Sequence, residues 1–400
     1  MGKIERIAAS YIYTGESAQP LRNSYVEFDS EDGTILSLGQ CAENELVVNA
    51  AIIPGMVNSH CHCELSHLQG KFVKGTGMAG FIDQINALRD WAGFDVKQQL
   101  VHKWMDKMWA DGVSAMADIS NDDSSFAVKA SHKMYTRTFL EVFGTEPEQC
   151  SRVMDDVAEL QSKADACGID AAPTPHSCYT MSPALLKASS AAGLKSGFLS
   201  YHSQESAEEE ELIRCGSGAM YDNRRRAGMS TPPVTGGSSL EYFIDSLAEV
   251  GKVPHPENVL LVHNVCTTER DAEAAREAFA NPYFALCPLS NIFIHNALPD
   301  VEMLWKKGLK LTVGTDSLSS NDDLDMVSEI ACLHEHFPAI PMGEIVRWAT
   351  LNGAQFLRKD DVLGSLSPGK RPGIVIVEGI DAEGNFVKGC RSRRLDYATF

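Results

Sequence analysis

Two histidines one residue apart end an apolar stretch of the chain. The stretch begins near Ala51 and ends at His60-Cys61-His62. Side chains alternate between the two faces of a β-strand, so these two imidazoles leave the backbone on the same side. Two neutral imidazole nitrogens at one strand end supply half of a tetrahedral metal site. Because a lone His-x-His pair also arises by chance, other parts of the chain must supply the remaining ligands.

Further polar and ionisable residues end other apolar stretches along the chain. Barrel enzymes carry their catalytic groups at the C-terminal ends of their strands. Packing alone does not explain polar residues that recur so regularly at strand ends. The pattern therefore predicts one shared site built from Asp118, Glu141, His176, His202, His263, Ser290, Asn291 and Asp316 together with the two histidines.

Short β-rich stretches alternate with amphipathic helical stretches through most of the chain, a pattern typical of parallel βα units. The helical stretches include residues 96–110, stopped by Asp111-Gly112, and residues 147–166, stopped before Gly168. Eight strand-then-helix repeats predict a (β/α)8 TIM-type barrel. The expected strands lie near residues 52–62, 112–120, 136–144, 169–178, 197–204, 259–266, 283–291 and 310–318.

The two ends of the chain show little helical period and contain several turn sequences, such as Glu31-Asp32-Gly33 and Pro368-Gly369-Lys370. Two ends of like character suggest one small domain. We expect a small β-sandwich domain built from residues 1–50 and 363–400, and a barrel domain over residues 51–362.

The composition favours a soluble globular protein, with 44% hydrophobic and 22% charged residues. A formal charge of −19 disfavours nucleic acids and anionic membranes as partners. Eleven cysteines without a C-x-x-C pair suit free thiols in a reducing cytosol. No apolar segment matches a signal peptide or a membrane span. We therefore expect a cytoplasmic protein that acts on a small molecule.

The strand-end residues sit in motifs that resemble those of the amidohydrolase superfamily. The likeness is strongest to its mononuclear branch of aminohydrolases and chlorohydrolases, which includes cytosine, guanine and adenosine-derivative deaminases. It covers nearly the whole chain. The motifs are Pro54-Gly55 through His60-Cys61-His62, His202-Ser203-Gln204-Glu205, Val262-His263, Cys287-Pro288-Leu289-Ser290-Asn291, Gly314-Thr315-Asp316-Ser317 and Leu363 through Lys370.

The resemblance implies that His60, His62, His202 and Asp316 hold one divalent ion per chain. Zinc is the expected ion and iron the alternative, since this ligand set does not separate them. Such an ion lowers the pKa of a bound water toward neutrality. Binuclear members bridge two ions with a carboxylated Lys or a Glu, and the fourth strand offers neither. Glu141 on the third strand could serve as such a bridge, but a second ion would also need His263 and would compete with the role of Glu205, so we expect one ion.

The resemblance also assigns the remaining candidates. Glu205 is the expected proton shuttle, and Asp316 accepts the proton of the water. His263 hydrogen-bonds the attacking group, with a direct role as a metal ligand as the alternative. The expected contacts to the substrate are His176, Glu64 and Ser290.

Two pairs of residues near the site have other expected roles. Asp118 and Glu141 either contact the substrate or tie strands together, and the sequence does not choose. Cys61 and Cys63 alternate with the histidines and are expected on the opposite face.

The predicted function is a metal-dependent hydrolytic deaminase of an aminated heterocycle, such as a purine, a nucleoside or an adenosine derivative. The alternatives are removal of chloride or an alkylamine from a triazine-like ring, and hydrolysis of a cyclic amide. A non-catalytic barrel protein is disfavoured because all the expected positions are filled. Homodimers are common in the branch, so a homodimer is a further expectation.

The longest insertion, residues 206–236, lies between the fifth and sixth strands. It contains the acidic run Glu208–Glu211 and the basic run Arg224–Arg226. We expect both runs to be solvated. The alternative for the insertion is a lid over the mouth of the barrel.

Overall fold

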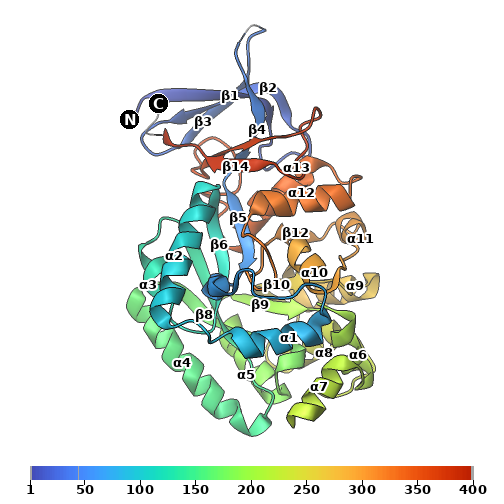
Figure 1. The fold of residues 1–400 in the computed structure, drawn as a ribbon. Helices are drawn as coiled ribbons and strands as arrows, with labels where there is room; N and C mark the ends of the chain where they lie inside the picture. The colour runs from blue at the N-terminus through green and yellow to red at the C-terminus, as the bar shows by residue number, and fades with distance from the viewer. Residues whose placement is uncertain (1, 44, 398–400) are drawn as a thin grey trace.

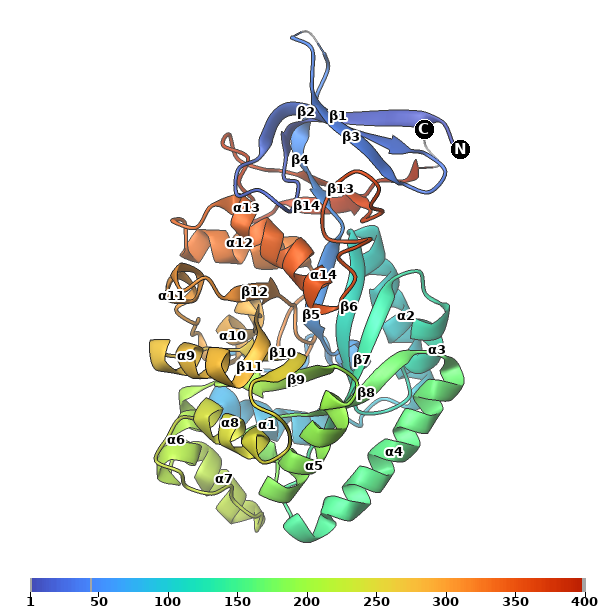
Figure 2. The same ribbon diagram turned by 180° about the vertical axis from the view of Figure 1, so that it is seen from behind.

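The computed structural model describes residues 2–43 and 45–397, which form an α/β fold with parallel sheets (Figure 1). Helices lie around the outside of the parallel strands, and a separate sheet built from strands near the two termini covers one end of the molecule (Figures 1 and 2). Among the described residues, no helix is both long and apolar enough to cross a membrane.

Two four-stranded parallel sheets carry the strand ends where the polar residues lie. The first has the order β5 (Met56–Cys61), β6 (Val113–Ser120), β7 (Tyr135–Val142) and β8 (Asp170–Pro175). The second has the order β12 (Lys310–Val313), β11 (Phe279–Leu286), β10 (His255–His263) and β9 (Phe198–Ser203). The predicted alternation of strand and helix is confirmed.

Backbone hydrogen bonds join the edges of the two parallel sheets near the strand ends. His202 N donates to His176 O at 2.9 Å, which links the end of β9 to the end of β8. At the other edge, Asp316 N donates to His60 O at 3.1 Å and links the segment after β12 to β5. These bonds bring candidate residues from both sheets to the same end of the fold.

The first expected barrel strand, residues 52–62, is two strands in different sheets. β4 (Val48–Pro54) belongs to the terminal sheet and β5 to the parallel sheet, with Gly55 between them. A Cβ at Gly55 would lie 2.0 Å from Ser114 Oγ and 2.2 Å from Pro372 O, so only glycine fits where the chain passes from one sheet to the other. Both strands are largely buried, and the residues on either side of Gly55 are apolar (Ile52 to Pro54, and Met56 with Val57), so hydrophobicity alone does not mark the break.

The terminal segments form one hydrogen-bonded sheet where the sequence suggested a sandwich of two. β4 pairs in parallel with β1 (Ile4–Ile12) and antiparallel with β13 (Ile374–Glu378), so the C-terminal strands extend the edge of the N-terminal sheet instead of covering its face. The full order is β14 (Arg391–Arg394), β13, β4, β1, β2 (Leu21–Asp29) and β3 (Ile35–Gln40).

Two predicted helices appear close to their expected bounds. The stretch 96–110 is α2 (Phe94–Ala110), and the stretch 147–166 is a short 3-10 turn, η2 (Pro147–Gln149), followed by α4 (Cys150–Cys167). Gly168 ends α4 in the left-handed conformation, with φ 70°, as expected for a C-terminal glycine.

The remaining helical elements connect the strands or pack around the sheets. They are η1 (Cys63–Leu68), α1 (Gly77–Leu88), α3 (Phe126–Ser131), η3 (Cys178–Thr180), α5 (Pro183–Leu194), α6 (Ala207–Cys215), α7 (Ala219–Ala227), α8 (Ser239–Ala248), α9 (Glu269–Ala278), α10 (Pro288–His295), α11 (Val301–Lys306), α12 (Met326–His336), α13 (Met342–Arg347), the π-helical turn η4 (Trp348–Asn352) and α14 (Gly353–Phe356).

The insertion over residues 206–236 is mostly helical, and the expectation of a solvated acidic run holds for Glu211 but is wrong for Glu209. The run begins α6, whose first backbone N–H groups need acceptors and favour carboxylates. Glu209 is fully buried, and Glu208 Oε2 accepts a hydrogen bond from Ala79 N in α1 at 2.7 Å. In the basic run, Arg224 is also buried and donates to Ser230 O at 2.7 Å.

A buried ion pair fixes the segment that follows β5. Lys129 Nζ in α3 lies 2.5 Å from Asp118 Oδ2 at the end of β6, and both side chains are almost fully buried. Asp118 Oδ1 accepts a hydrogen bond from Cys63 N at 2.8 Å, which anchors the start of η1 directly after His62. The sequence allowed two roles for Asp118, and these contacts support the one in which it ties strands together.

Replacing Lys129 with Met should destabilise the protein by about 3–5 kcal/mol, because it leaves the Asp118 carboxylate buried without a countercharge. Denaturant unfolding followed by circular dichroism measures the loss. Lys163→Met is the control, since Lys163 pairs with Asp123 at the exposed surface and its loss should leave the unfolding midpoint unchanged. Equal effects of the two substitutions would contradict this interpretation of the buried pair.

Candidate metal centre and active site

The predicted metal ligands meet at the C-terminal ends of the parallel strands. His60 lies in β5, His62 directly follows it, His202 lies in β9, and Asp316 follows β12. All four side chains are at least nine-tenths buried. Residues separated by up to 256 positions in the sequence thus share one small volume, as the strand-end pattern predicted.

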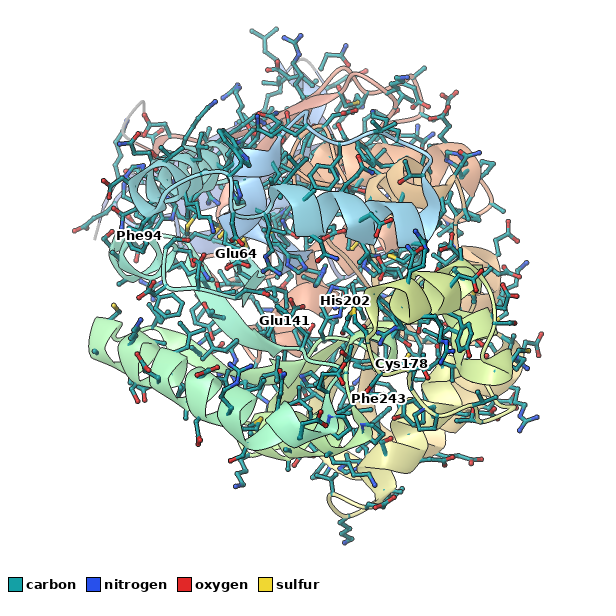
Figure 3. All side chains as sticks on the ribbon, turned by 60° about the horizontal axis from the view of Figure 1, so that its bottom comes forward. Glu64, Phe94, Glu141, Cys178, His202 and Phe243 are labelled. Atoms are coloured by element: carbon teal, nitrogen blue, oxygen red, sulfur yellow. The ribbon has the colours of Figure 1, made fainter. Side chains whose placement is uncertain are left out.

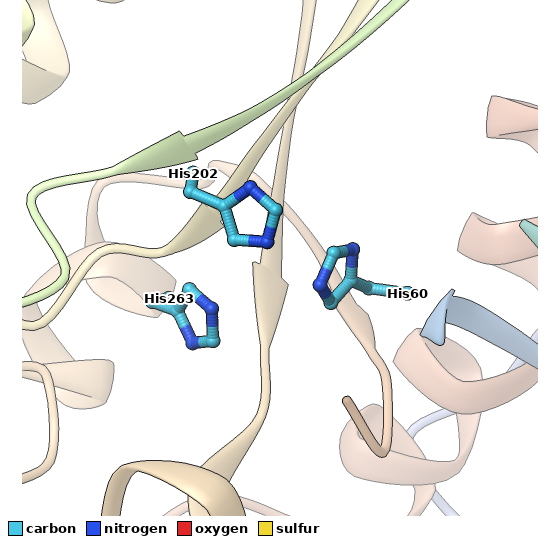
Figure 4. Close-up of side chains that lie close together, drawn as sticks. All are labelled: His60, His202 and His263. Atoms are coloured by element: carbon cyan, nitrogen blue, oxygen red, sulfur yellow. The ribbon is translucent and has the colours of Figure 1, made fainter. Parts of the chain in front are cut away.

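The imidazole rings point their Nε2 atoms at one another. His62 Nε2 lies 3.2 Å from His60 Nε2 and 3.4 Å from His202 Nε2. Asp316 Oδ1 lies 3.7 Å from both His60 Nε2 and His62 Nε2. Figure 4 shows the rings of His60, His202 and His263 converging on a common space from different strands.

These separations fit a bound divalent ion. Two nitrogens that bind one tetrahedral ion at 2.0–2.1 Å lie about 3.3 Å apart, close to both distances seen here. Three sets of donors lie mutually within 4.8 Å: His60, His202 and His263; His60, His62 and Asp316; and His62, Glu141 and His202.

Burial favours the neutral, metal-binding form of the His60 and His202 rings. Loss of solvent lowers the pKa of His60 and of His202 well below the ordinary value, and neighbouring imidazoles lower both further. His202 Nδ1 lies 3.2 Å from the carbonyl oxygen of His176. A proton on Nδ1 donates to that carbonyl and leaves a lone pair on Nε2, which is the tautomer a metal ligand needs.

Asp316 is held as a carboxylate. Burial alone would raise its pKa, but the imidazoles of His62, His263 and His60 outweigh that effect and hold the pKa at about 2. Its backbone is left-handed, with φ 55°, and its amide is bonded to His60 O. These constraints aim Asp316 Oδ1 at the histidines.

Ser290 supports Asp316 and does not line the cavity. Its hydroxyl donates to Asp316 Oδ2 at 2.6 Å, and Ser320 donates to the same oxygen at 2.7 Å. Ser290 is fully buried, and its hydroxyl is engaged by these neighbours. The expected contact of Ser290 with the substrate is therefore replaced by a contact that orients a candidate metal ligand.

Glu205 and His263 form a pair beside the imidazole cluster. Glu205 Oε1 lies 3.3 Å from His263 Nε2, and both residues line the cavity. His263 Nδ1 lies 2.9 Å from Asn291 Oδ1, which fixes the orientation of the ring. The other carboxylate oxygen, Glu205 Oε2, accepts a hydrogen bond from the hydroxyl of Tyr179 at 2.7 Å.

Tyr179 was missed by the sequence analysis. It lies in η3, three residues after His176, and is almost fully buried. The only signal in the sequence was its position in the Pro175-His176-Ser177-Cys178-Tyr179 segment after the fourth strand. The strand-end pattern marks only residues at the strand ends themselves, and Tyr179 reaches the site from the turn beyond.

His176 and Glu141 lie next to His202 Nδ1, on the side of the ring away from the clustered Nε2 atoms. The rings of His176 and His202 stack with their centroids 4.5 Å apart. Glu141 Oε1 lies 3.6 Å from His202 Nδ1 and 3.9 Å from His176 Nε2. Glu141 Oε2 accepts a hydrogen bond from Asn121 Nδ2 at 3.0 Å. Glu141 thus lies next to His202 and also lines the cavity, so its position is compatible with both of its sequence interpretations.

Glu64 lines the cavity near His62. Its Oε2 accepts hydrogen bonds from the backbone amides of Asn121 at 2.6 Å and Asp122 at 3.2 Å. Burial, reinforced by Asp122, raises the pKa of Glu64 to about 8. Figure 3 shows Glu64, Glu141 and His202 in the same part of the molecule. The side chain of Glu64 is held in place by these amides and can form a hydrogen bond with a molecule in the cavity.

Most apolar side chains of the cavity lining come from helix α1, which forms an apolar wall. Most polar ones come from the strand ends and the turns after them, which form a polar wall; Asn86 of α1 and Phe143 after β7 are exceptions. Cys63, by contrast, points away from the cavity and donates its thiol to Asp118 at 3.1 Å. The apolar lining residues of α1 are Met78, Phe81, Ile82 and Ile85.

The sequence matches the model of the amidohydrolase family over residues 51–397. The chain belongs to this family. The predicted class of enzyme, a hydrolase of carbon–nitrogen bonds other than peptide bonds, is thereby confirmed.

The chain is also similar to a curated relative and, in its fold, to two solved structures. The chain is 25% identical over 353 residues to the 5-methylthioadenosine/S-adenosylhomocysteine deaminase of Thermoanaerobacter pseudethanolicus, across 81% of this chain and 72% of that protein. Its fold is similar to that of Helicobacter pylori aminofutalosine deaminase in complex with methylthio-coformycin, with a TM-score of 0.75, 20% identity and coverage of 94% and 93% of the two chains. It is also similar to an adenosine deaminase from Xanthomonas campestris with bound zinc, with a TM-score of 0.69, 22% identity and coverage of 93% and 84%.

Tyr179→Phe should lower kcat about tenfold and leave the metal content unchanged. The substitution removes one hydrogen bond to the Glu205 carboxyl group, and a bond to a charged group contributes roughly 1.5–3 kcal/mol. Steady-state kinetics and metal analysis measure the two quantities. Tyr135→Phe is the matched control, because Tyr135 donates to Asp170 near the opposite ends of the strands. An unchanged kcat in Tyr179→Phe would show that this hydrogen bond does not matter to turnover.

Proposed function

We propose that this protein is a metal-dependent hydrolytic deaminase whose substrate is an adenosine derivative or a similar aminated heterocycle. The observation that carries the proposal is the placement of the Glu205–His263 pair beside the converging Nε2 atoms of the histidines. The two parallel sheets would close into one eight-stranded barrel, supported by the hydrogen bonds at both edges.

His60, His62, His202 and Asp316 would hold one divalent ion, with zinc as our proposal. The zinc in the Xanthomonas campestris structure supports that choice. When bound in such a site, a divalent ion supplies hydroxide near neutral pH by lowering the pKa of a water molecule. Ser290 and Ser320 keep Asp316 aimed at the site, and the carbonyl of His176 keeps His202 in the required tautomer.

Glu205 would move the protons of the reaction. Deamination requires a proton on the ring nitrogen next to the carbon under attack, and later a proton on the departing amino group. Glu205 Oε1 faces the same cavity as the histidines, while Tyr179 restrains Oε2. His263, fixed by Asn291, would accept a hydrogen bond from the hydroxyl group that adds to the ring.

The two walls of the cavity suit a flat aminated ring with a polar substituent. The apolar side chains of α1 can pack against the face of such a ring. His176, Glu64 and Glu141 offer hydrogen-bonding groups on the opposite wall. The similarity to the Thermoanaerobacter pseudethanolicus deaminase supports a substituted adenosine as the first substrate to test.

Zinc-loaded protein should release ammonia from at least one member of a panel of adenosine derivatives, purine bases and pterins. Coupled ammonia detection measures the reaction, and the ultraviolet spectrum of the product identifies the ring that changed. Zinc-replete protein without turnover on such a panel would argue against deamination.

Glu205→Gln should keep its zinc and lose at least a hundredfold in kcat, because an amide cannot carry the proton. His202→Ala should lose both zinc and turnover, because it removes a ligand. Inductively coupled plasma analysis and kinetics on the same samples separate the two effects. A Glu205→Gln variant with a near-normal rate would exclude Glu205 as the proton carrier.

A further inference from the structure

The segment that carries Glu205 leaves β9 through an unfavourable backbone turn. Gln204, the residue before Glu205, has φ 49°, in the left-handed region that non-glycine residues rarely adopt. Such a conformation persists only where surrounding contacts hold it. The contacts that hold the amides of Gln204 and Glu205 therefore decide where the Glu205 carboxyl group points.

One buried carboxyl group holds both of these amides. Glu209 Oε1 accepts a hydrogen bond from Gln204 N at 3.1 Å, and Glu209 Oε2 accepts one from Glu205 N at 2.8 Å. Glu209 lies in the first turn of α6, where Ser206 Oγ accepts a hydrogen bond from Glu209 N at 3.1 Å. Its side chain thus reaches back across the turn and fixes the segment before its own helix.

The same carboxyl group contacts the segment that carries Tyr179. Cys178 Sγ lies 3.4 Å from Glu209 Oε1 as a thiol donor. Cys178 and Tyr179 are neighbours in η3, and the hydroxyl of Tyr179 donates to Glu205 Oε2. Glu209 therefore contacts Gln204 and Cys178, the residues directly before Glu205 and Tyr179. It thereby fixes both partners of the hydrogen bond that restrains the Glu205 carboxyl group.

We propose that Glu209 is a positioning residue that acts through Glu205, by fixing the backbone of Gln204 and Glu205 against the segment of Tyr179. This inference rests on the proposed function, in which Glu205 carries the protons. Glu209 is fully buried and is not among the residues that line the cavity, so it does not contact the substrate. It acts only by holding the two segments in place.

Burial adds to the cost of disturbing this arrangement. Loss of solvent raises the pKa of Glu209 to about 8, partly offset by the hydrogen bond from Glu205 N. Glutamine in its place has one carbonyl oxygen and one NH₂ group, and the NH₂ group cannot accept a hydrogen bond. Glu209→Gln therefore loses at least one of the two hydrogen bonds from Gln204 N and Glu205 N, whether or not Glu209 is protonated in the wild-type protein. The volume of the side chain changes little.

The first test is a double-mutant cycle with Glu205. Glu209→Gln should lower kcat at least tenfold in the wild-type background, with KM within about twofold and zinc content unchanged. In a Glu205→Gln background it should lower the residual kcat by less than twofold, because Glu209 acts only through Glu205. Equal losses in both backgrounds, or a normal kcat in the wild-type background, would overturn the proposal.

The second test does not depend on activity. Hydrogen–deuterium exchange of Glu209→Gln should become faster in peptides that cover residues 177–181 and 203–206, and should stay unchanged in α2. Unchanged exchange in those peptides would overturn the positioning role. Failure of the wild-type protein to deaminate any substrate would sink the proposed function alone, because the exchange experiment still decides whether Glu209 holds these segments.

The matched control is Glu211→Gln in the same helix. Glu211 is exposed and accepts a hydrogen bond only from Ser217 Oγ among the contacts described for its side chain. Its replacement makes the same chemical change in the same helix as Glu209→Gln, but at an exposed side chain that does not bind the amides of Gln204 and Glu205. Normal kinetics and normal exchange in Glu211→Gln assign the effects to the contacts of Glu209, whereas a matching loss in Glu211→Gln would assign them to helix charge and contradict the proposal.

Discussion

The structure depends on a cluster of buried imidazole nitrogens that face one another. His62 Nε2 lies within 3.4 Å of two other Nε2 atoms, at the largely buried end of the cavity. Neutral rings in this arrangement direct lone pairs at each other, and protonated rings would repel. A divalent ion removes both problems, because each lone pair then becomes a ligand bond. The surrounding fold supplies the constraints that keep the rings in place.

Those constraints come from the ends of the strands. The hydrogen bond from Asp316 N to His60 O joins the two parallel sheets. It holds one candidate metal ligand of each sheet, Asp316 and His60, next to the other. Asp316 and His263 both have left-handed backbones, with φ 55° and 75°, so the chain bends sharply as each strand ends and turns the side chain inward. The Asp118–Lys129 pair adds a third anchor, through Cys63, just after His62.

The sequence predicted the positions of those site residues that lie at the ends of apolar strands. His60, His62, His202, His263 and Asp316 each follow or end an apolar run, so their meeting could be expected from the parallel strands alone. The break at Gly55 could not be predicted in this way, because the residues directly before and after it are apolar. Ser290 was at the correct strand end, but the sequence does not show that its hydroxyl would turn toward Asp316.

Residues that act from outside the strands were harder to find. Tyr179 reaches Glu205 from a 3-10 turn, where no periodicity marks a direction. Glu209 lies in an acidic run, and four consecutive glutamates resemble a solvated surface unless the backbone amides that need an acceptor are known. Lys129 gave no signal either, since a lysine on a short helix is usually exposed. In each case the decisive partner is distant in sequence or is a backbone group.

The central claim is that one cation joins these distant segments of the chain. The most direct test is anomalous diffraction at the zinc absorption edge from crystals of zinc-replete protein. The account predicts a single strong anomalous peak about 2.0–2.2 Å from the Nε2 atoms of His60, His62 and His202 and from one oxygen of Asp316. Zinc-replete crystals that show no peak among these atoms, with the imidazoles turned away from one another, would contradict it.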